Sequence, residues 1–150
     1  MNPQHFALLK EVFEKRIVFN SVIGMEILSA EDGKASLRFD MKPELVGNFN
    51  LQILHGGVIS AALDVIGAVA VIAGFPEHSP MFSMGTVDLR TDFLRPGRGK
   101  QFTATGSVMR HGRILSSTRM ELVNETGDLI ATGTAVYRVS TKEEFKLVNV

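Results

Sequence analysis

The feature that most constrains this chain is a long, alanine-rich and almost wholly apolar run that begins near Gly56 and ends at Phe75. A helix that is apolar on every side must be buried, either by protein or by lipid. A membrane span needs about 20 mostly apolar residues, and Val58–Phe75 is slightly shorter. Asp64 near its middle would cost about 2.5–3.5 kcal/mol in a bilayer. We therefore expect no membrane partner and predict a central helix buried by protein.

Asp64 on such a helix has two interpretations. An unpaired buried carboxylate is costly, so Asp64 is either a structural residue held by hydrogen bonds or a catalytic carboxylate. At the helix entrance, Gly56 and Gly57 let a ligand approach the backbone closely. The first N–H groups of a helix are unpaired and can polarise a carbonyl oxygen. The alternative is that the two glycines only form a tight turn.

The spacing of these two features limits how they can cooperate. Asp64 follows Gly56 by eight residues, which places it about 12 Å further along the helix axis. Reacting groups must lie about 3 Å apart, so one substrate carbon cannot touch both features of one helix. If both act on one substrate, they come from two subunits with opposed helices, which predicts a two-fold dimer. Sixteen Lys plus Arg balance sixteen Asp plus Glu, which leaves little charge repulsion against such pairing.

The rest of the chain predicts one α+β domain, since 150 residues suffice for about one domain. An amphipathic helix is expected within residues 1–20, and alternation around Asp32-Gly33 predicts a β-hairpin. Residues 42–55 are expected to form a loop, and 140–150 a C-terminal tail. The remaining alternating runs predict strands over roughly 81–94, 100–110, 114–123 and 129–139. This order favours one antiparallel sheet around or against the central helix.

Composition excludes several classes of function. Without cysteine the chain has no disulfide, thiolate nucleophile or zinc–thiolate site. The four histidines are scattered, so we expect no metal site built from histidine, whereas a carboxylate site stays open. We also expect no cofactor. Zero net charge argues against a nucleic-acid partner. Charged residues interrupt the apolar positions of Met1–Arg16, unlike a signal peptide, so we expect a cytoplasmic location.

Four stretches of the chain form a recognisable set. Leu54–Asp64 contains His-Gly-Gly and ends in the aspartate, and Thr86–Pro96, Val108–Arg113 and Leu129–Tyr137 follow in order. Together they resemble the hotdog-fold acyl-CoA thioesterases of the phenylacetate-degradation type, over most of the chain. The resemblance implies a curved antiparallel sheet of about six strands wrapped around a long central helix, in a homodimer or homotetramer. It also implies hydrolysis of an acyl-CoA thioester to the free acid and CoA.

The resemblance also implies roles for individual residues. In that family the carboxylate at the position of Asp64 is the general base or the nucleophile. The N–H at Gly56 polarises the thioester carbonyl from the opposite subunit. Thr86 occupies the place of a hydroxyl residue that orients the water or the carboxylate. His55 is expected to shape the helix entrance through hydrogen bonds rather than to transfer protons.

The loop before the helix carries one further expected role and one departure. An asparagine upstream of the histidine helps to place substrate or water in the family. Asn48 or Asn50 could fill that position, and we prefer Asn48. Many relatives have glycine three residues before the histidine, where this chain has Gln52. That difference puts the geometry of the loop in question.

The expected substrate also needs a phosphate site and an acyl site. Arginine suits phosphate geometry, and the candidate cations on the later strands and turns are Arg90, Arg95, Arg98, Lys100, Arg110 and Arg113. The alternative for each of them is a solvated strand face. Candidates for the acyl end are Phe75, Met81, Phe82 and Met84. Two other functions stay open, a non-catalytic acyl-CoA binding domain and a hotdog-fold hydratase or dehydratase.

Overall fold

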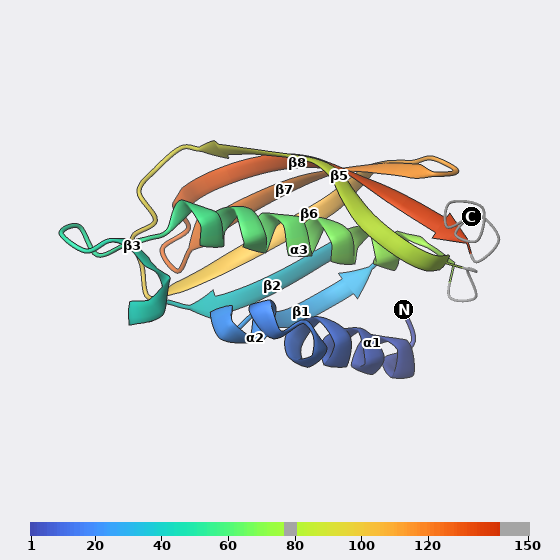
Figure 1. Cartoon of the computed structure of the whole chain (residues 1–150), viewed down its shortest axis with the longest axis horizontal. Helices are drawn as coiled ribbons and strands as arrows, with labels where there is room; N and C mark the ends of the chain where they lie inside the picture. Colours follow the sequence, from blue (N-terminus) through green and yellow to red (C-terminus); the bar gives the residue numbers. More distant parts are fainter. Residues whose placement is uncertain (77–80, 142–150) are drawn as a thin grey trace, which may run out of the picture.

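A six-stranded antiparallel sheet curves around one long helix, α3 (Gly56–Gly74), in the computed structural model (Figure 1). The structure describes residues 1–76 and 81–141, so most of the predicted tail over 140–150 lies outside the described residues. The strand order in the sheet is β1-β2-β6-β7-β8-β5. These strands are β1 (Glu26–Glu31), β2 (Lys34–Asp40), β5 (Met81–Phe93), β6 (Gln101–His111), β7 (Leu115–Asn124) and β8 (Leu129–Thr141).

The strands form where the sequence alternates between apolar and polar residues. In β2, Ala35, Leu37 and Phe39 are buried while their neighbours are more exposed. Asp32 and Gly33, both with positive φ, form the two-residue turn between β1 and β2 that twisted hairpins favour. Helix α3 and strands β5 to β8 begin and end within two residues of the predicted ranges. The predicted hairpin, central helix and four later strands are therefore confirmed.

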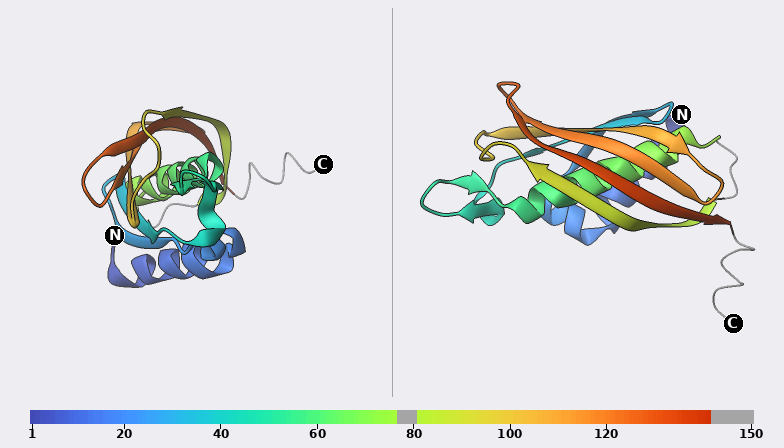
Figure 2. Two further views of the ribbon diagram at one scale, coloured as in Figure 1. Left: turned by 90° about the vertical axis from the view of Figure 1, so that its left-hand side faces the viewer. Right: turned by 90° about the horizontal axis from the view of Figure 1, so that it is seen from above.

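Helix α3 is the core helix of the domain. It is long and apolar enough to cross a membrane, but 56% of its most apolar stretch of 18 residues is buried inside the protein. Ala62, Leu63 and Ile66 have no exposed surface. Figure 2 shows the sheet curving around α3, with the N-terminal helices beside it.

The helix backbone approaches the sheet closely at one glycine. Gly106 of β6 is buried, and a Cβ atom added to it would lie 2.8 Å from the carbonyl oxygen of Ile66. Real Cβ atoms essentially never come that close to backbone. The absence of a side chain at Gly106 therefore sets how near α3 can lie to the middle of the sheet.

The N-terminal segment is helical but is not the single helix that its sequence predicts. Asn2 caps α1 (Pro3–Lys10) by accepting a hydrogen bond from the N–H of His5 at 2.9 Å. A π-helical turn, η1 (Glu11–Arg16), follows, and the extended backbone of Ile17 separates it from α2 (Val18–Ile23).

This segment covers the β1 edge of the sheet. Lys10 Nζ donates to the carbonyl oxygen of Ile27 at 2.8 Å, and the N–H of Ile27 donates to Glu14 Oε1 at 2.7 Å. Two backbone groups that an edge strand would otherwise offer to another strand are therefore occupied.

Residues 42–55 contain more structure than the predicted loop. A 3₁₀ turn, η2 (Pro43–Leu45), leads into a two-stranded sheet of β3 (Val46–Asn48) and β4 (Ile53–Leu54). This hairpin extends beyond the first turn of α3 (Figure 1). Strands of two or three residues are too short to show alternation, which explains why the sequence predicted only a loop.

We predict that Gly106→Ala destabilises the protein by about 1–3 kcal/mol, because its Cβ overlaps the backbone of α3. Alanine normally stabilises a strand relative to glycine, so a lower free energy of unfolding in this variant would indicate a steric clash. Urea unfolding measures it, with Thr105→Ala on the exposed neighbouring position as the control. Equal unfolding free energies for the two variants would contradict this account of the packing.

Candidate active site

The entrance of α3 is capped by the histidine of the His-Gly-Gly motif. His55 is the N-cap residue, and its Nδ1 accepts a hydrogen bond from the N–H of Gly57 at 2.8 Å. For His55, the resemblance implies hydrogen bonds that shape the helix entrance. Gly56 is the first helical residue, so its N–H has no partner within the helix. The Phe93 ring flanks this position, 3.3 Å from where a Cβ of Gly56 would lie.

The two candidate asparagines lie in the β3–β4 hairpin, near the helix entrance. Asn48 Oδ1 accepts hydrogen bonds from the N–H groups of Asn50 and Leu51, at 3.1 and 3.0 Å. Asn48 therefore shapes the turn that contains Asn50. Both side chains are exposed in the single chain, and neither lines the cavity beside Asp64.

The same turn explains the departure at Gln52. Gln52 has a φ of 50°, in the left-handed region that favours glycine. Its Nε2 donates to the carbonyl oxygen of Phe49 at 2.7 Å, which holds the turn closed. A glycine would adopt this conformation without strain. The loop therefore has the backbone conformation that favours glycine, although residue 52 is glutamine.

The carboxylate of Asp64 lies in the middle of α3 beside strand β5. Thr86 Oγ1 donates a hydrogen bond to Asp64 Oδ1 at 2.8 Å. The Tyr137 hydroxyl of β8 donates to the backbone carbonyl oxygen of Asp64 at 2.7 Å. Burial, and secondarily the Asp64 charge, raise the pKa of Tyr137, so this hydroxyl stays protonated as a donor. Two strands thus fix the helical turn that carries the carboxylate.

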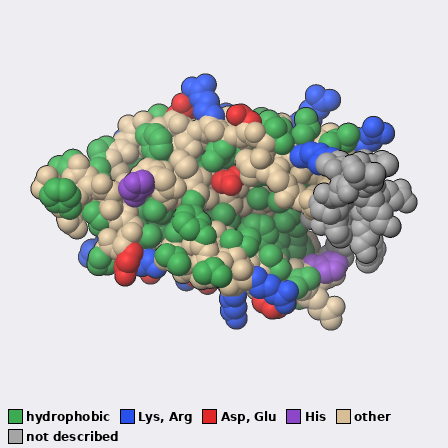
Figure 3. Space-filling model, in the orientation of Figure 1, with side chains coloured by type: hydrophobic (Ala, Val, Ile, Leu, Met, Phe, Trp, Pro, Cys, Tyr) green, Lys and Arg blue, Asp and Glu red, His purple; other side chains and the backbone are tan. Residues whose placement is uncertain are grey.

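An apolar cavity of about 360 Å³ opens beside Asp64, and we call it the carboxylate cavity. Its wall is shared by α3, strand β5 and the N-terminal segment. The lining includes Phe13, Ile17, Ala61, Asp64, Val65, Ala68, Met84 and Thr86. Figure 3 shows hydrophobic side chains gathered on this face of the molecule. A polar reacting group with an apolar extension would match a carboxylate beside such a wall.

The helix entrance and the carboxylate are two separate regions of one chain. Gly56 and Asp64 lie on the same helix, so about 12 Å of helix separates them. His55, Gly57, Asn48 and Asn50 lie in or beside the helix entrance. Thr86 and Tyr137 contact Asp64.

The candidate cations do not form one cluster in the single chain. Arg95, Arg98 and Lys100 lie at the sheet end beside the entrance of α3, where the N–H of Leu54 donates to the carbonyl oxygen of Gly97. Arg110 and Arg113 flank His111, which lies against Gly74 at the opposite end of the helix.

Three of the candidate arginines already have partners in the protein. Arg90 is paired with Asp92 at 2.9 Å, which raises the pKa of the guanidinium. Arg95 donates to the carbonyl oxygen of Leu129 at 2.9 Å, and Arg98 donates to the carbonyl oxygen of Leu51 at 3.3 Å. All three side chains are exposed to solvent.

Two of the candidates for the acyl end line different cavities along α3. Met84 lines the carboxylate cavity, and Phe75 lines a second cavity at the end of the helix. The side chains of Met81 and Phe82 lie outside the described part of the structure. Over residues 1–76 and 81–141, no three His, Asp or Glu side chains could together hold a metal ion.

Sequence reasoning assigned no role to Tyr137 or Phe93. Tyr137 is the single tyrosine of the chain and is fully buried. A buried tyrosine needs a partner for its hydroxyl, but the sequence does not reveal that this partner is the backbone of Asp64.

Comparison with known proteins identifies the family of the chain. A sequence profile described as "Thioesterase superfamily" matches residues 51–131. The chain is 42% identical over 146 residues to "Medium/long-chain acyl-CoA thioesterase YigI" of Salmonella typhimurium, covering 91% of this chain and 94% of the relative. The protein of the same name from Escherichia coli is 43% identical with the same coverage.

Solved structures agree as well. A Shewanella oneidensis protein related to the thioesterase superfamily is 39% identical, with a TM-score of 0.77, covering 93% of this chain and 100% of that one. The Escherichia coli PaaI protein from the phenylacetic acid degradation operon is 21% identical, with a TM-score of 0.72, covering 89% and 94%. The second likeness shows the fold alone. The chain therefore belongs to the thioesterase superfamily and has the hotdog fold.

Proposed function

We propose that this protein hydrolyses acyl-CoA thioesters, with Asp64 as the group that activates water or attacks the thioester carbonyl. The observation that carries the proposal is the hydrogen bond from Thr86 to Asp64 Oδ1 beside the apolar carboxylate cavity. The similar proteins named medium/long-chain acyl-CoA thioesterase support acyl groups of that size as substrates.

The overall reaction adds water across the carbon–sulfur bond. In the direct route Asp64 takes a proton from water while the water oxygen bonds to the carbonyl carbon. The negative charge that forms on the carbonyl oxygen needs hydrogen-bond donors. The carbon–sulfur bond then breaks, the CoA sulfur takes up the proton, and the acid is released. In the alternative route Asp64 bonds to the carbonyl carbon, the carbon–sulfur bond breaks, and the CoA thiolate leaves and takes up a proton from solvent. Water then hydrolyses the resulting anhydride, which releases the acid and restores the Asp64 carboxylate.

A second copy of the chain would supply the missing donor. The β1 edge of the sheet is covered by Lys10 and Glu14, whereas β5 has β8 on one side and no strand on the other in the described part of the chain. Val87 of β5 is 61% exposed. An open edge strand is a template for strand pairing. Two-fold pairing of β5 would oppose the two α3 helices and bring the Gly56 N–H of one chain toward Asp64 of the other.

We predict that Asp64→Asn lowers kcat by about 10²–10⁴-fold, because it removes the proton acceptor. Thr86→Val is expected to lower kcat about tenfold or more through loss of a hydrogen bond to a charged group. Thr86→Ser keeps the hydroxyl and serves as the control. Stopped and continuous assays with acyl-CoA substrates measure these effects, and full activity of Asp64→Asn would remove Asp64 from the mechanism.

The donor role of Gly56 can be tested without disturbing the helix. Proline is well tolerated at the first helical position, and His55 already has the extended backbone required before proline. We expect Gly56→Pro to lower kcat by about 10²–10³-fold because it removes one N–H donor. Gly56→Ala adds a similar atom beside Phe93 but keeps the N–H, so it should retain most of the activity. Equal losses in both variants would indicate a steric effect instead.

A mixed dimer tests whether the site is shared. Differently tagged Asp64→Asn and Gly56→Pro chains are co-expressed and the heterodimer is purified through both tags. Each homodimer lacks a complete site, whereas the heterodimer contains one, so about half of the wild-type activity should return. Activity no higher than that of the two homodimers would contradict the shared site.

An assay for free CoA distinguishes hydrolysis from hydration and from binding without turnover. A thiol reagent detects free CoA directly, and the chain has no cysteine to react with it. Hydration of an acyl-CoA releases no thiol, and a binding domain gives no turnover. Thermal stabilisation by acyl-CoA without thiol release would favour the binding domain.

A further inference from the structure

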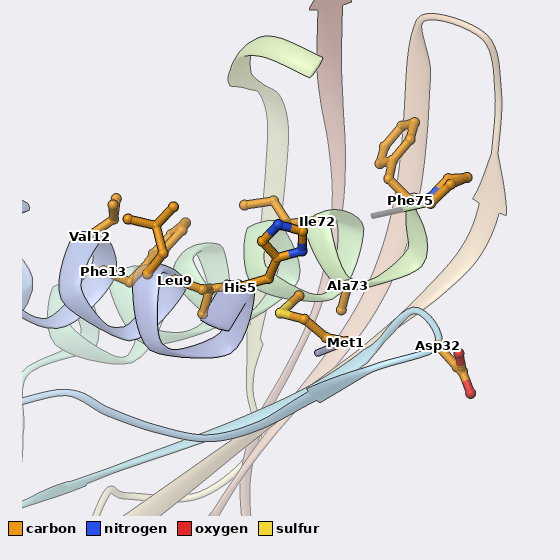
Figure 4. Close-up of a pocket in the computed structure, with 11 residues that line it drawn as sticks. Met1, His5, Leu9, Val12, Phe13, Asp32, Ile72, Ala73 and Phe75 are labelled. Atoms are coloured by element: carbon orange, nitrogen blue, oxygen red, sulfur yellow. The ribbon is translucent and has the colours of Figure 1, made fainter. Parts of the chain in front are cut away.

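A second cavity lies beyond the carboxylate cavity, between the N-terminal segment and the end of α3. It has a volume of about 510 Å³, and we call it the distal cavity. Figure 4 shows Leu9, Val12 and Phe13 on one side and Ile72, Ala73 and Phe75 on the other. The proposed reaction does not by itself require this space.

The two cavities share one residue, Phe13, and one face of α3. Phe13 lines both of them. Along the helix, Ala61, Val65 and Ala68 line the carboxylate cavity, and Ile72 lines the distal cavity. This spacing places the four side chains in one stripe on the helix surface. An apolar path therefore runs from Asp64 past Phe13 toward the end of the helix.

The chemistry of the distal cavity selects an apolar occupant. Of the eleven residues that line it, only His5 and Asp32 have polar side chains, and Asp32 is exposed. The other nine side chains of that lining are apolar and offer a polar ligand no strong hydrogen bond. Burial of hydrocarbon against the remaining side chains is favourable by the hydrophobic effect.

From this geometry we infer that the acyl chain of the substrate runs from Asp64 along α3 beneath the N-terminal segment, and that Phe13 separates short from long substrates. The inference rests on the proposed thioesterase function. It assigns the distal cavity to the far end of a long acyl chain.

Helix geometry gives the chain lengths concerned. Asp64 is about 6 Å from Ala68 and about 16 Å from Phe75 along the axis. A fully extended chain advances roughly 1.2 Å per bond, as the extended polypeptide does over its three bonds per residue. Acyl groups of roughly six carbons or fewer therefore end near Ala68, inside the carboxylate cavity. Chains of roughly ten to fourteen carbons pass Phe13 and fill the distal cavity.

The backbone around Phe13 suits a residue whose side chain divides two cavities. Phe13 belongs to the π-helical turn η1, a feature often found at functional sites. Its carbonyl oxygen accepts a hydrogen bond from Asn20 Nδ2 at 2.9 Å, and Asn20 is buried. The backbone is thus anchored to α2, while the ring faces both cavities.

The test compares two identical substitutions in the same segment. Val12 lines the distal cavity, whereas Val18 is 70% exposed and lines neither cavity. We expect Val12→Trp to lower the ratio of kcat/KM for tetradecanoyl-CoA to that for butyryl-CoA, by roughly fourfold per methylene excluded. Val18→Trp should leave this ratio unchanged. Phe13→Ala should raise the ratio by widening the path.

The outcomes separate this inference from the proposed function. If Val12→Trp and Val18→Trp give the same ratio while both hydrolyse butyryl-CoA, the acyl path is wrong and the thioesterase function stands. If the wild type hydrolyses no acyl-CoA, the proposed function is wrong. In that case the acyl path is tested by thermal stabilisation with tetradecanoic acid. Stabilisation of the wild type and of Val18→Trp, but not of Val12→Trp, would still support the path. No stabilisation of the wild type would overturn the path. Val12→Trp keeps the test valid if Phe13→Ala does not fold.

Discussion

The whole structure depends on the burial of α3, a helix that is apolar on nearly every side. Such a helix is stable only where other elements exclude water from it. The curved sheet buries one face and comes close because Gly106 has no side chain. The N-terminal segment covers part of the other face, and two cavities lie between them. The acyl chain is proposed to occupy apolar surface that these elements leave uncovered, and the second subunit is proposed to pair with the open edge of β5.

Much of the fold could be predicted from local sequence, because period-two alternation and turn residues bound the strands. The positions of β5 to β8 follow from such patterns. The order of strands in the sheet does not, because pairing between distant strands leaves no local signal. The break at Ile17 is similarly hidden, since Val12 and Phe13 continue the helical spacing up to the turn that precedes it.

The candidate site was predicted in a different way. Asp64 and Thr86 are 22 residues apart, and their roles came from the resemblance to a family rather than from spacing. The structure brings these two side chains together. Arg110 and Arg95, in contrast, lie at opposite ends of the sheet. Arg95 follows the end of β5, and β6 then runs the length of the sheet before it reaches Arg110. The backbone of Gln52 was also beyond local patterns, since its left-handed conformation is unusual for a residue other than glycine.

The position of Thr86 on an edge strand has a consequence for regulation. In the proposed dimer, β5 would both pair with the second chain and hold the catalytic carboxylate through Thr86. Dissociation would then remove the partner's donor and also release the strand that orients the aspartate. Catalysis would follow mass action, so specific activity would fall steeply as the protein is diluted below its dissociation constant. The cellular abundance of the protein would thereby set not only how many active sites exist but what fraction of them can work.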